Sequence, residues 1–229
     1  MKTYLLLENV CRLELPAEFH DDDVRFAESL VEYFVKAFSR EGDVIFDPFA
    51  GYGTTLRVAE ALGRVAYGLE FDERRVGYAR SLLQNPENLL HGDARNLADY
   101  ALPAFDLSIT SPPYMTRHDV DDPLTAYTCR GRGYAAYLED MGQIYAQMRE
   151  LIKPGGRAVI EVANLKVDGE LTPLAWDLAG QVSRELVFEG EMVACWDEYG
   201  YGYDHSYCLV FAKSPRPGGL SSKLDAASS

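Results

Sequence analysis

The stretch TSPPY, residues Thr110 to Tyr114, places two prolines and an aromatic ring directly after an apolar run. Consecutive prolines fix their own φ angles and restrict the residue before them, so this turn is rigid and lacks two backbone N–H donors. The direction of its carbonyl groups is therefore built into the chain, and Tyr114 offers a face on which a planar ring could stack. The alternative is a plain Pro-Pro turn whose tyrosine packs inward.

A second stretch that could do chemistry is DPFAGYGTT, residues Asp47 to Thr55, which is rich in glycine and joins an expected strand to an expected helix. It is not a phosphate-binding P-loop, because that motif needs a Gly-Lys-Ser/Thr end. It also departs from a dinucleotide fingerprint, because Leu56 stands where a third glycine belongs and Asp47 would repel pyrophosphate. A ligand with a cationic amine and no phosphate, such as S-adenosylmethionine, suits this acidic turn better.

Two further acids suit the same ligand. Glu70 ends the second expected strand, where it could accept hydrogen bonds from both ribose hydroxyls. Asp93 follows the third, where it could accept a hydrogen bond from the adenine amino group. Each has a simpler explanation, which is a surface carboxylate for Glu70 and a helix cap for Asp93. Acids at three successive strand ends together favour cofactor binding.

An alternation of strands and helices must position these residues. Hydrophobic patterning predicts strands at 43–47, 65–70, 88–94, 105–110, 157–163, 186–196 and 207–213, and helices at 21–38, 54–62, 72–83, 134–152 and 174–185. This order predicts an α/β fold with a doubly wound, mostly parallel seven-stranded sheet and an antiparallel hairpin at one edge. Ligands of such sheets bind beyond the carboxyl ends of the strands, which is where the stretches above fall.

The chain has 229 residues and a net charge of −14. We expect one domain over residues 1–213, with 115–133 as a possible substrate-recognition insertion and 214–229 as a disordered tail. Without a signal peptide, a long apolar span or a C-x-x-C spacing, we expect a cytoplasmic protein with free thiols, no membrane contact and no metal site. The acidity argues against a basic nucleic-acid-binding face, unless a local patch or a second subunit supplies one.

Taken together, DPFAGYGTT, LEFD, GDA and TSPPY make the chain resemble the S-adenosylmethionine-dependent amino-methyltransferases, and among them the DNA N4-cytosine and N6-adenine methyltransferases. The glycine motif of this family is typically D-P-F-x-G-[ST]-G-T-T, and its catalytic motif is [DNS]-P-P-[YFW]. Both occur here, with Tyr52 at the small-residue position. The stretch from His20 is similar to a family element that helps to hold the methionine end, although the proline that usually follows the histidine is absent. The resemblance covers roughly residues 19–163 and implies the class I methyltransferase fold.

The resemblance also implies roles for individual residues. The Ser111 hydroxyl and the Pro112 carbonyl would accept hydrogen bonds from an exocyclic amine, while Tyr114 stacks on the ring that carries it. The catalytic residues would be Ser111, Pro112, Pro113 and Tyr114. The cofactor-binding residues would be His20, Asp47, Pro48, Phe49, Ala50, Gly51, Gly53, Thr54, Thr55, Glu70, Phe71, Asp93 and Ala94. The candidate substrate-binding residues are Tyr114, Arg117, Tyr127, Arg130 and Arg132, the last three of which could equally be surface residues of the insertion.

The sequence therefore predicts an S-adenosylmethionine-dependent N-methyltransferase that acts on a nucleobase, with cytosine N4 or adenine N6 in DNA as the favoured acceptor. Because a large recognition region and a basic face are missing, RNA, a free base or another planar amine or amide stays an alternative. A third hypothesis is a regulatory subunit that binds a cofactor or partner without catalysis. Nucleic acid is the expected partner, and a homodimer is one way to supply a basic surface.

Overall fold

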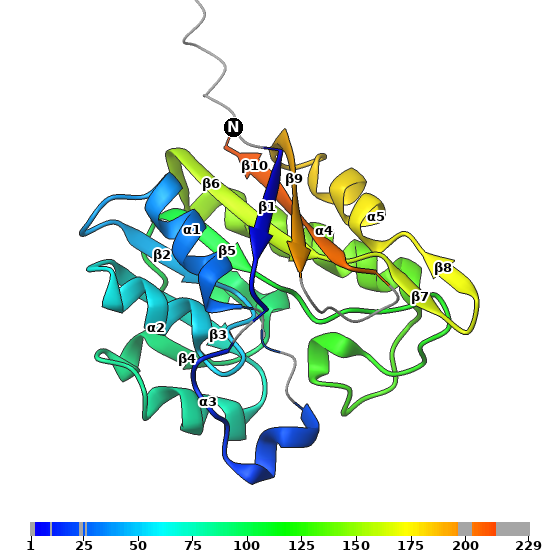
Figure 1. Ribbon diagram of the computed structural model, residues 1–229, viewed down its shortest axis with the longest axis horizontal. Coiled ribbons are helices and arrows are strands. Elements are labelled where there is room, and N and C mark those ends of the chain that lie inside the picture. The colour runs from blue at the N-terminus through cyan, green and yellow to red at the C-terminus, as the bar shows by residue number, and fades with distance from the viewer. Residues whose placement is uncertain (1–2, 10, 23–24, 26, 197–202, 214–229) are drawn as a thin grey trace, which may run out of the picture.

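The structure, a computed structural model, describes residues 3–9, 11–22, 25, 27–196 and 203–213, with residues 21 and 22 described by their backbone only. A twisted sheet runs through the molecule, and helices cover both of its faces (Figure 1). The predicted tail at 214–229 lies outside the described residues. Within the described part of the chain, none of the helices has the length and apolar character needed to cross a bilayer.

The main sheet has eight strands in the described residues, in the order β1-β9-β10-β6-β5-β2-β3-β4. Their bounds are β1 (Tyr4–Leu7), β2 (Val44–Asp47), β3 (Val65–Glu70), β4 (Leu89–His91), β5 (Phe105–Thr110), β6 (Ile152–Val162), β9 (Val187–Trp196) and β10 (His205–Ala212). The strands β2 to β6 pair in parallel, whereas β10 runs antiparallel to β6 and β9. All seven predicted strands are present, and the doubly wound α/β fold is confirmed.

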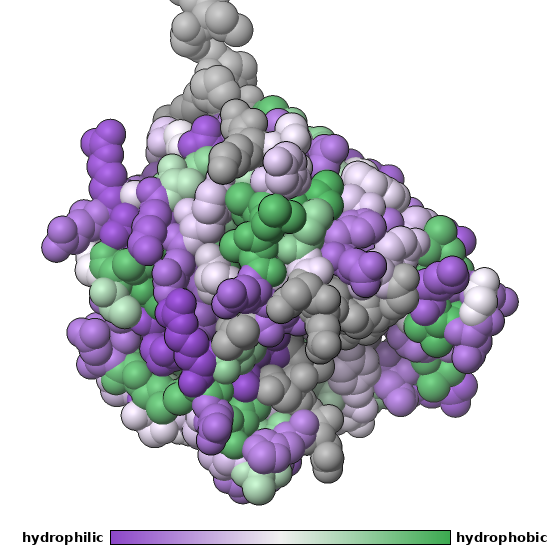
Figure 2. All heavy atoms as spheres, in the orientation of Figure 1, coloured by the Kyte–Doolittle hydropathy of each residue, from purple (hydrophilic) through white to green (hydrophobic). Residues whose placement is uncertain are grey.

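The eighth strand, β1, pairs in parallel with β9, so the β9–β10 hairpin lies one strand in from the edge of the sheet. Covering an exposed edge in this way removes a row of unpaired backbone groups from β9. Figure 2 shows apolar side chains gathered over β1, where Leu6 is 75% exposed. The sequence suggested only an irregular arm or a short strand for this segment.

Two hydrophobic cores fill the space between the sheet and its helices. The helices α1 (Glu28–Phe38), α2 (Thr54–Ala61) and α3 (Glu73–Arg80) cover one face, and α4 (Tyr134–Leu151) and α5 (Leu174–Val182) cover the other. The strand β6 divides its side chains between the two cores by simple alternation, with Ile160 and Val162 in the core under α4 and α5 and Val159 in the opposite one. Because both faces are buried, the central strands are almost continuously apolar in sequence.

The first helix begins later than the sequence pattern predicts. The prediction of a start at Asp21 is wrong, because α1 begins at Glu28 and Ala17–Asp22 form a separate 3-10 helix. The cause is tertiary packing: Phe19 is buried against the ring of Tyr52, with the two centroids 5.3 Å apart. The predicted apolar stripe of α1 is nevertheless buried as expected, through Ala27, Leu30, Phe34 and Val35.

A small hairpin formed by β7 (Leu165–Val167) and β8 (Glu170–Thr172) was not predicted. Its turn residues Asp168 and Gly169 both have positive φ angles, of 50° and 80°. An Asp-Gly pair between two short apolar runs is a known signal for a two-residue hairpin turn, so the sequence did contain this information. Figure 2 shows an apolar area over this hairpin, where Val167 and Leu171 are exposed.

Candidate active site

The glycine-rich loop leaves the carboxyl end of β2 and turns sharply into α2. Gly51 and Gly53 have φ angles of 53° and 80°, which favour glycine. A Cβ atom at Gly53 would lie 3.1 Å from the Cβ atom of Ala79 on α3, so the loop approaches this helix closely. A hydrogen bond from Ala50 N to Leu69 O (2.9 Å) fastens the loop to β3. The loop is therefore held in one shape by its neighbours on both sides.

We expect Gly53→Ala to lower the free energy of unfolding by about 1–2 kcal/mol, because alanine is strained at positive φ and its methyl group would press on Ala79. Gly77→Ala is the matched control: Gly77 is exposed on α3, and nothing lies within 4 Å of an added Cβ atom. That change should be neutral or stabilise the protein by up to about 1 kcal/mol. Urea unfolding curves measure both, and equal effects would show that the loop tolerates a side chain.

Asp47 ends β2 and is completely buried. Its Oδ1 accepts hydrogen bonds from Phe49 N (3.0 Å) and from the Thr110 hydroxyl (2.6 Å), whereas its Oδ2 has no partner in the described structure. Burial raises the pKa of this carboxyl to about 6, and the Thr110 hydrogen bond opposes the shift. At neutral pH the loop therefore surrounds a buried negative charge with one free oxygen, which favours a cationic ligand group.

Glu70 ends β3 beside the same loop. Its Oε2 accepts a hydrogen bond from Gly51 N (2.8 Å), and its Oε1 accepts one from Asp72 N (2.8 Å). The side chain is only 7% exposed, so Glu70 is not a surface carboxylate, and burial raises its pKa. Each carboxylate oxygen keeps a second lone pair, so Glu70 can still accept hydrogen bonds from two ligand hydroxyls.

Asp93 is already engaged within the protein. It caps the 3-10 helix Ala94–Asp99 by accepting a hydrogen bond from Arg95 N (2.9 Å), and it forms an ion pair with the Arg95 guanidinium (2.6 Å). Its hydrogen bond raises the pKa of Arg95 further above the usual value. An adenine amino group would have to share this carboxylate with Arg95. The helix-cap explanation accounts for the contacts of Asp93, and Ala94 is buried in the core.

The other predicted cofactor-binding residues lie in several different parts of the structure. His20 lies 2.8 Å from Leu15 O through its Nε2, so its observed partner belongs to the N-terminal arm. The Thr55 hydroxyl donates to Ile109 O (3.4 Å) on β5 and thereby ties α2 to the sheet. Of the remaining residues, Pro48, Phe49 and Ala50 follow the end of β2, Thr54 begins α2, and Phe71 follows the end of β3. The structure thus brings together the glycine loop, Asp47 and Glu70, whereas His20 contacts another segment.

The Ser111–Tyr114 turn leaves β5 directly beside the glycine loop, because β5 pairs with β2. The Ser111 hydroxyl donates to Glu161 Oε2 (2.8 Å), and the Tyr114 hydroxyl donates to the same oxygen (3.1 Å). Since Ser111 gives its only hydrogen to Glu161, its lone pairs are left to accept a hydrogen bond. The Tyr114 ring is half-buried and packs against the core under α4 and α5, and its hydroxyl is anchored to Glu161.

Glu161 was missed in the sequence analysis. It lies near the end of β6 and is 2% exposed, within the otherwise apolar run AVIEVA. A single acid inside a strand that is buried on both faces was the available signal, because buried acids need specific partners. Its partners lie 50 and 47 residues earlier in the chain, so only the three-dimensional structure reveals them.

The predicted substrate-binding arginines of the insertion are largely paired with acids. The Arg117 guanidinium lies 3.7 Å from Asp177, and the Arg132 guanidinium lies 2.7 Å from Asp140. Arg130 is exposed and forms a backbone bridge with Asp121. Two of the three predicted arginines of the insertion therefore lie beside acids, in keeping with the acidic composition of the chain.

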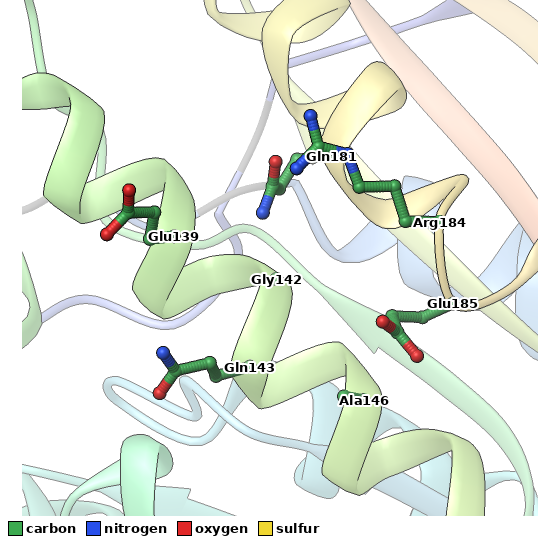
Figure 3. Close-up of a pocket in the computed structure, with 7 residues that line it drawn as sticks. All are labelled: Glu139, Gly142, Gln143, Ala146, Gln181, Arg184 and Glu185. Atoms are coloured by element: carbon green, nitrogen blue, oxygen red, sulfur yellow. The ribbon is translucent and has the colours of Figure 1, made fainter.

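The structure also contains a hollow of about 260 Å³ between α4 and the end of α5 (Figure 3). It is lined by Glu139, Gly142, Gln143, Ala146, Gln181, Arg184 and Glu185. None of these is a predicted site residue, and the hollow is lined by α4, α5 and the turn after α5 rather than by the loops at the strand ends. It is therefore separate from the candidate active site.

The chain matches the DNA methylase family of N6 and N4 amino-methyltransferases over residues 16–81. This match covers the glycine loop and Glu70 but ends before Ser111. The type II methyltransferase M.BglII of Bacillus subtilis is 34% identical over 68 residues, which are 28% of this chain and 19% of that protein. The chain spans about a fifth of the length of the curated relatives it matches. The sequence-based resemblance to this family is confirmed over the matched segment.

Solved structures agree on the fold. TrmN from Thermus thermophilus superposes with a TM-score of 0.59 at 20% identity, over 82% of this chain and 49% of that one. A TehB-like S-adenosylmethionine-dependent methyltransferase from Corynebacterium glutamicum superposes with a TM-score of 0.56 at 16% identity, over 86% and 93% of the two chains. The fold is that of the class I methyltransferases.

Proposed function

We propose that the chain is an S-adenosylmethionine-dependent N-methyltransferase that acts on an exocyclic amino group of a nucleobase, with cytosine N4 or adenine N6 in DNA as the favoured acceptor. One observation carries this proposal: Thr110 joins two loops by donating a hydrogen bond to Asp47 (2.6 Å). One loop surrounds a buried acid with a free oxygen, and the other presents Ser111, Pro112 and Tyr114. A site for a cation and a site for an amine are therefore adjacent.

The residues of the first loop fit S-adenosylmethionine better than a phosphate ligand. Asp47 Oδ2 would accept a hydrogen bond from the ammonium group, and Glu70 would accept from the ribose hydroxyls. Two buried acids beside the loop would repel a phosphate. When bound, S-adenosylmethionine supplies an electrophilic methyl carbon, which the amine lone pair attacks as the carbon–sulfur bond breaks.

An aromatic amine is a weak nucleophile because its lone pair is delocalised into the ring, and the second loop can make it more reactive. The Ser111 oxygen and the Pro112 carbonyl can each accept an N–H bond of the amine and favour the tetrahedral nitrogen of the transition state. In the part of the chain that the structure describes, no group donates to the Pro112 carbonyl. The Tyr114 ring would stack on a base that is turned out of its strand.

The methylated nitrogen must also lose a proton. Ser111 Oγ can accept this proton while its own hydrogen passes to Glu161 Oε2, with which it already shares a 2.8 Å hydrogen bond. The nitrogen then becomes neutral, and Glu161 becomes a neutral acid that later releases its proton to water. Glu161 acts through Ser111 in this scheme and is a positioning residue for it.

The comparisons support DNA as the substrate, because the family that matches the segment with the glycine loop is described as DNA methylase, and M.BglII is a type II methyltransferase by name. One observation favours the second candidate, which is RNA, a free base or another planar amine or amide. The insertion that would meet a substrate pairs Arg117 and Arg132 with acids and so offers few free cations to a phosphate backbone.

Mass spectrometry of nucleosides tests the proposal directly. Single-stranded and duplex DNA, RNA and free nucleosides are incubated with the protein and methyl-labelled S-adenosylmethionine, and calorimetry measures cofactor binding in parallel. Label on cytosine N4 or adenine N6 from DNA is the expected result. Label confined to RNA or to free nucleosides would move the assignment to the second candidate. Cofactor binding without transfer to any acceptor would point instead to a non-catalytic subunit.

A further inference from the structure

In the Ser111–Tyr114 turn, the backbone carbonyl groups of Pro112, Pro113 and Tyr114 have different surroundings. The Pro113 carbonyl accepts a hydrogen bond from the Tyr137 hydroxyl on α4 (2.9 Å), and the Tyr114 carbonyl accepts one from the Tyr127 hydroxyl in the insertion (2.9 Å). The Pro112 carbonyl has no such donor in the described structure. Two tyrosines from different segments thus fix the peptide groups that follow Pro112 and leave its own carbonyl available.

Tyr127 is held in an unusual backbone conformation. Its φ angle is 59°, and that of the preceding Ala126 is 50°, so two residues with side chains occupy the left-handed region in succession. This conformation is unfavourable for a residue with a Cβ atom, and it persists where the surroundings enforce it. Here the Tyr127 N–H donates to Asp122 O (3.1 Å), which folds the chain back on itself and presents the ring toward the turn.

Asp122 is in turn fixed by Arg95. The Arg95 guanidinium bonds Asp122 (2.9 Å) and Asp93 (2.6 Å), and it lies 3.8 Å from Asp140 on α4. A continuous set of contacts therefore runs from Asp93, at the end of β4, through Arg95 and Asp122 to Tyr127. The two steps through Arg95 pair opposite charges, and the last step is the backbone hydrogen bond from Tyr127 N to Asp122 O, so the insertion is anchored to the body of the domain.

We propose that Tyr127 is a positioning residue for the acceptor site, and that the Arg95–Asp122 ion pair anchors it. By holding the Tyr114 carbonyl, Tyr127 fixes the turn so that the Pro112 carbonyl and the Tyr114 ring keep the directions that an amine-bearing base requires. The insertion thus shapes the catalytic turn through its hydroxyl group, in addition to any contact with substrate. This inference rests on the proposed methyl transfer.

Tyr127→Phe tests the hydroxyl alone, because it keeps the ring. We expect kcat for methyl transfer to fall about tenfold, as for the loss of one aligned hydrogen bond, with the KM for nucleic acid and the cofactor Kd within twofold of wild type. Tyr33→Phe, on α1, is the matched control and should change nothing. A Tyr127→Phe variant with the wild-type kcat and KM would overturn the inference. A rise in KM at unchanged kcat would overturn it too, because Tyr127 would then contact only the substrate.

A second substitution tests the anchor. Asp122→Asn keeps a side-chain cap for the Leu124 N–H but weakens the ion pair to Arg95. We expect a smaller loss in kcat, and no further loss when it is combined with Tyr127→Phe, because both act on one contact. Additive losses would contradict the anchoring step. Absence of transfer by the wild-type protein would instead refute the proposed function itself, so the two failures are distinguishable.

Discussion

Glu161→Gln is expected to lower kcat for methyl transfer by about 10²-fold while leaving the cofactor Kd unchanged. Glutamine keeps an oxygen that can accept hydrogen bonds from the Ser111 and Tyr114 hydroxyls, so the turn should retain its shape. It cannot take up the proton that Ser111 would pass on. Single-turnover rates with labelled cofactor, together with calorimetry of cofactor binding, separate the two effects.

Ser111→Ala provides the partner experiment. If Ser111 and Glu161 act as one unit, the double variant should be no slower than the slower single variant. Glu87→Gln, an exposed acid in the loop before β4, is the control for loss of charge and should leave kcat unchanged. If the double variant instead loses the product of the two single-variant losses in kcat, Ser111 and Glu161 do not form a relay.

Asp47→Asn is expected to weaken S-adenosylmethionine binding by about 10²-fold at pH 7, because it removes the buried charge that would meet the ammonium group. In the wild-type protein, affinity should fall roughly tenfold between pH 7 and pH 5, as Asp47 is protonated through its pKa of about 6. The variant should lack this pH dependence. Calorimetry across that range measures both quantities, and a variant that binds as wild type does would exclude Asp47 as the cation partner.

The raised pKa of Asp47 also predicts how the unfolding free energy of the ligand-free protein changes with pH. Burial raises the folded-state pKa of Asp47 above its unfolded value, so its contribution to stability is fully present at low pH and is lost as pH rises through about 6. The difference in unfolding free energy between wild type and Asp47→Asn should therefore fall by about 2 kcal/mol from pH 4.5 to pH 8. A difference that does not change between pH 4.5 and pH 8 would mean that the Asp47 carboxyl keeps its unfolded-state pKa.

The sequence predicted where Asp47 and Glu70 lie in the sheet, for a physical reason. In a parallel sheet the residue that ends a strand lies at a shared edge, so the positions of Asp47 and Glu70 follow from the strand pattern alone. The positive φ angles of Gly51 and Gly53 were likewise implied by a short loop between a strand and a helix. These features depend on local pattern and on the general rules of the fold.

The features that were missed depend on contacts between distant segments. Nothing local shows that Ser111 would meet Glu161, or that Asp93 would be engaged by Arg95. The false start of α1 has the same origin, because the segment before it docks through Phe19 onto the glycine loop. Propensity could not foresee such packing, since tertiary contacts override a weak local preference.

The hydrogen bond from Thr110 to Asp47 also joins the two halves of the sheet. It crosses from β2 to β5, where the strand order of the sheet reverses. The segment recognised in the DNA methylase family, residues 16–81, lies wholly on the β2 side, whereas Ser111, Tyr127 and Glu161 lie beyond the crossing. This one hydrogen bond therefore couples the half of the sheet that would hold the methyl donor to the half that would hold its acceptor.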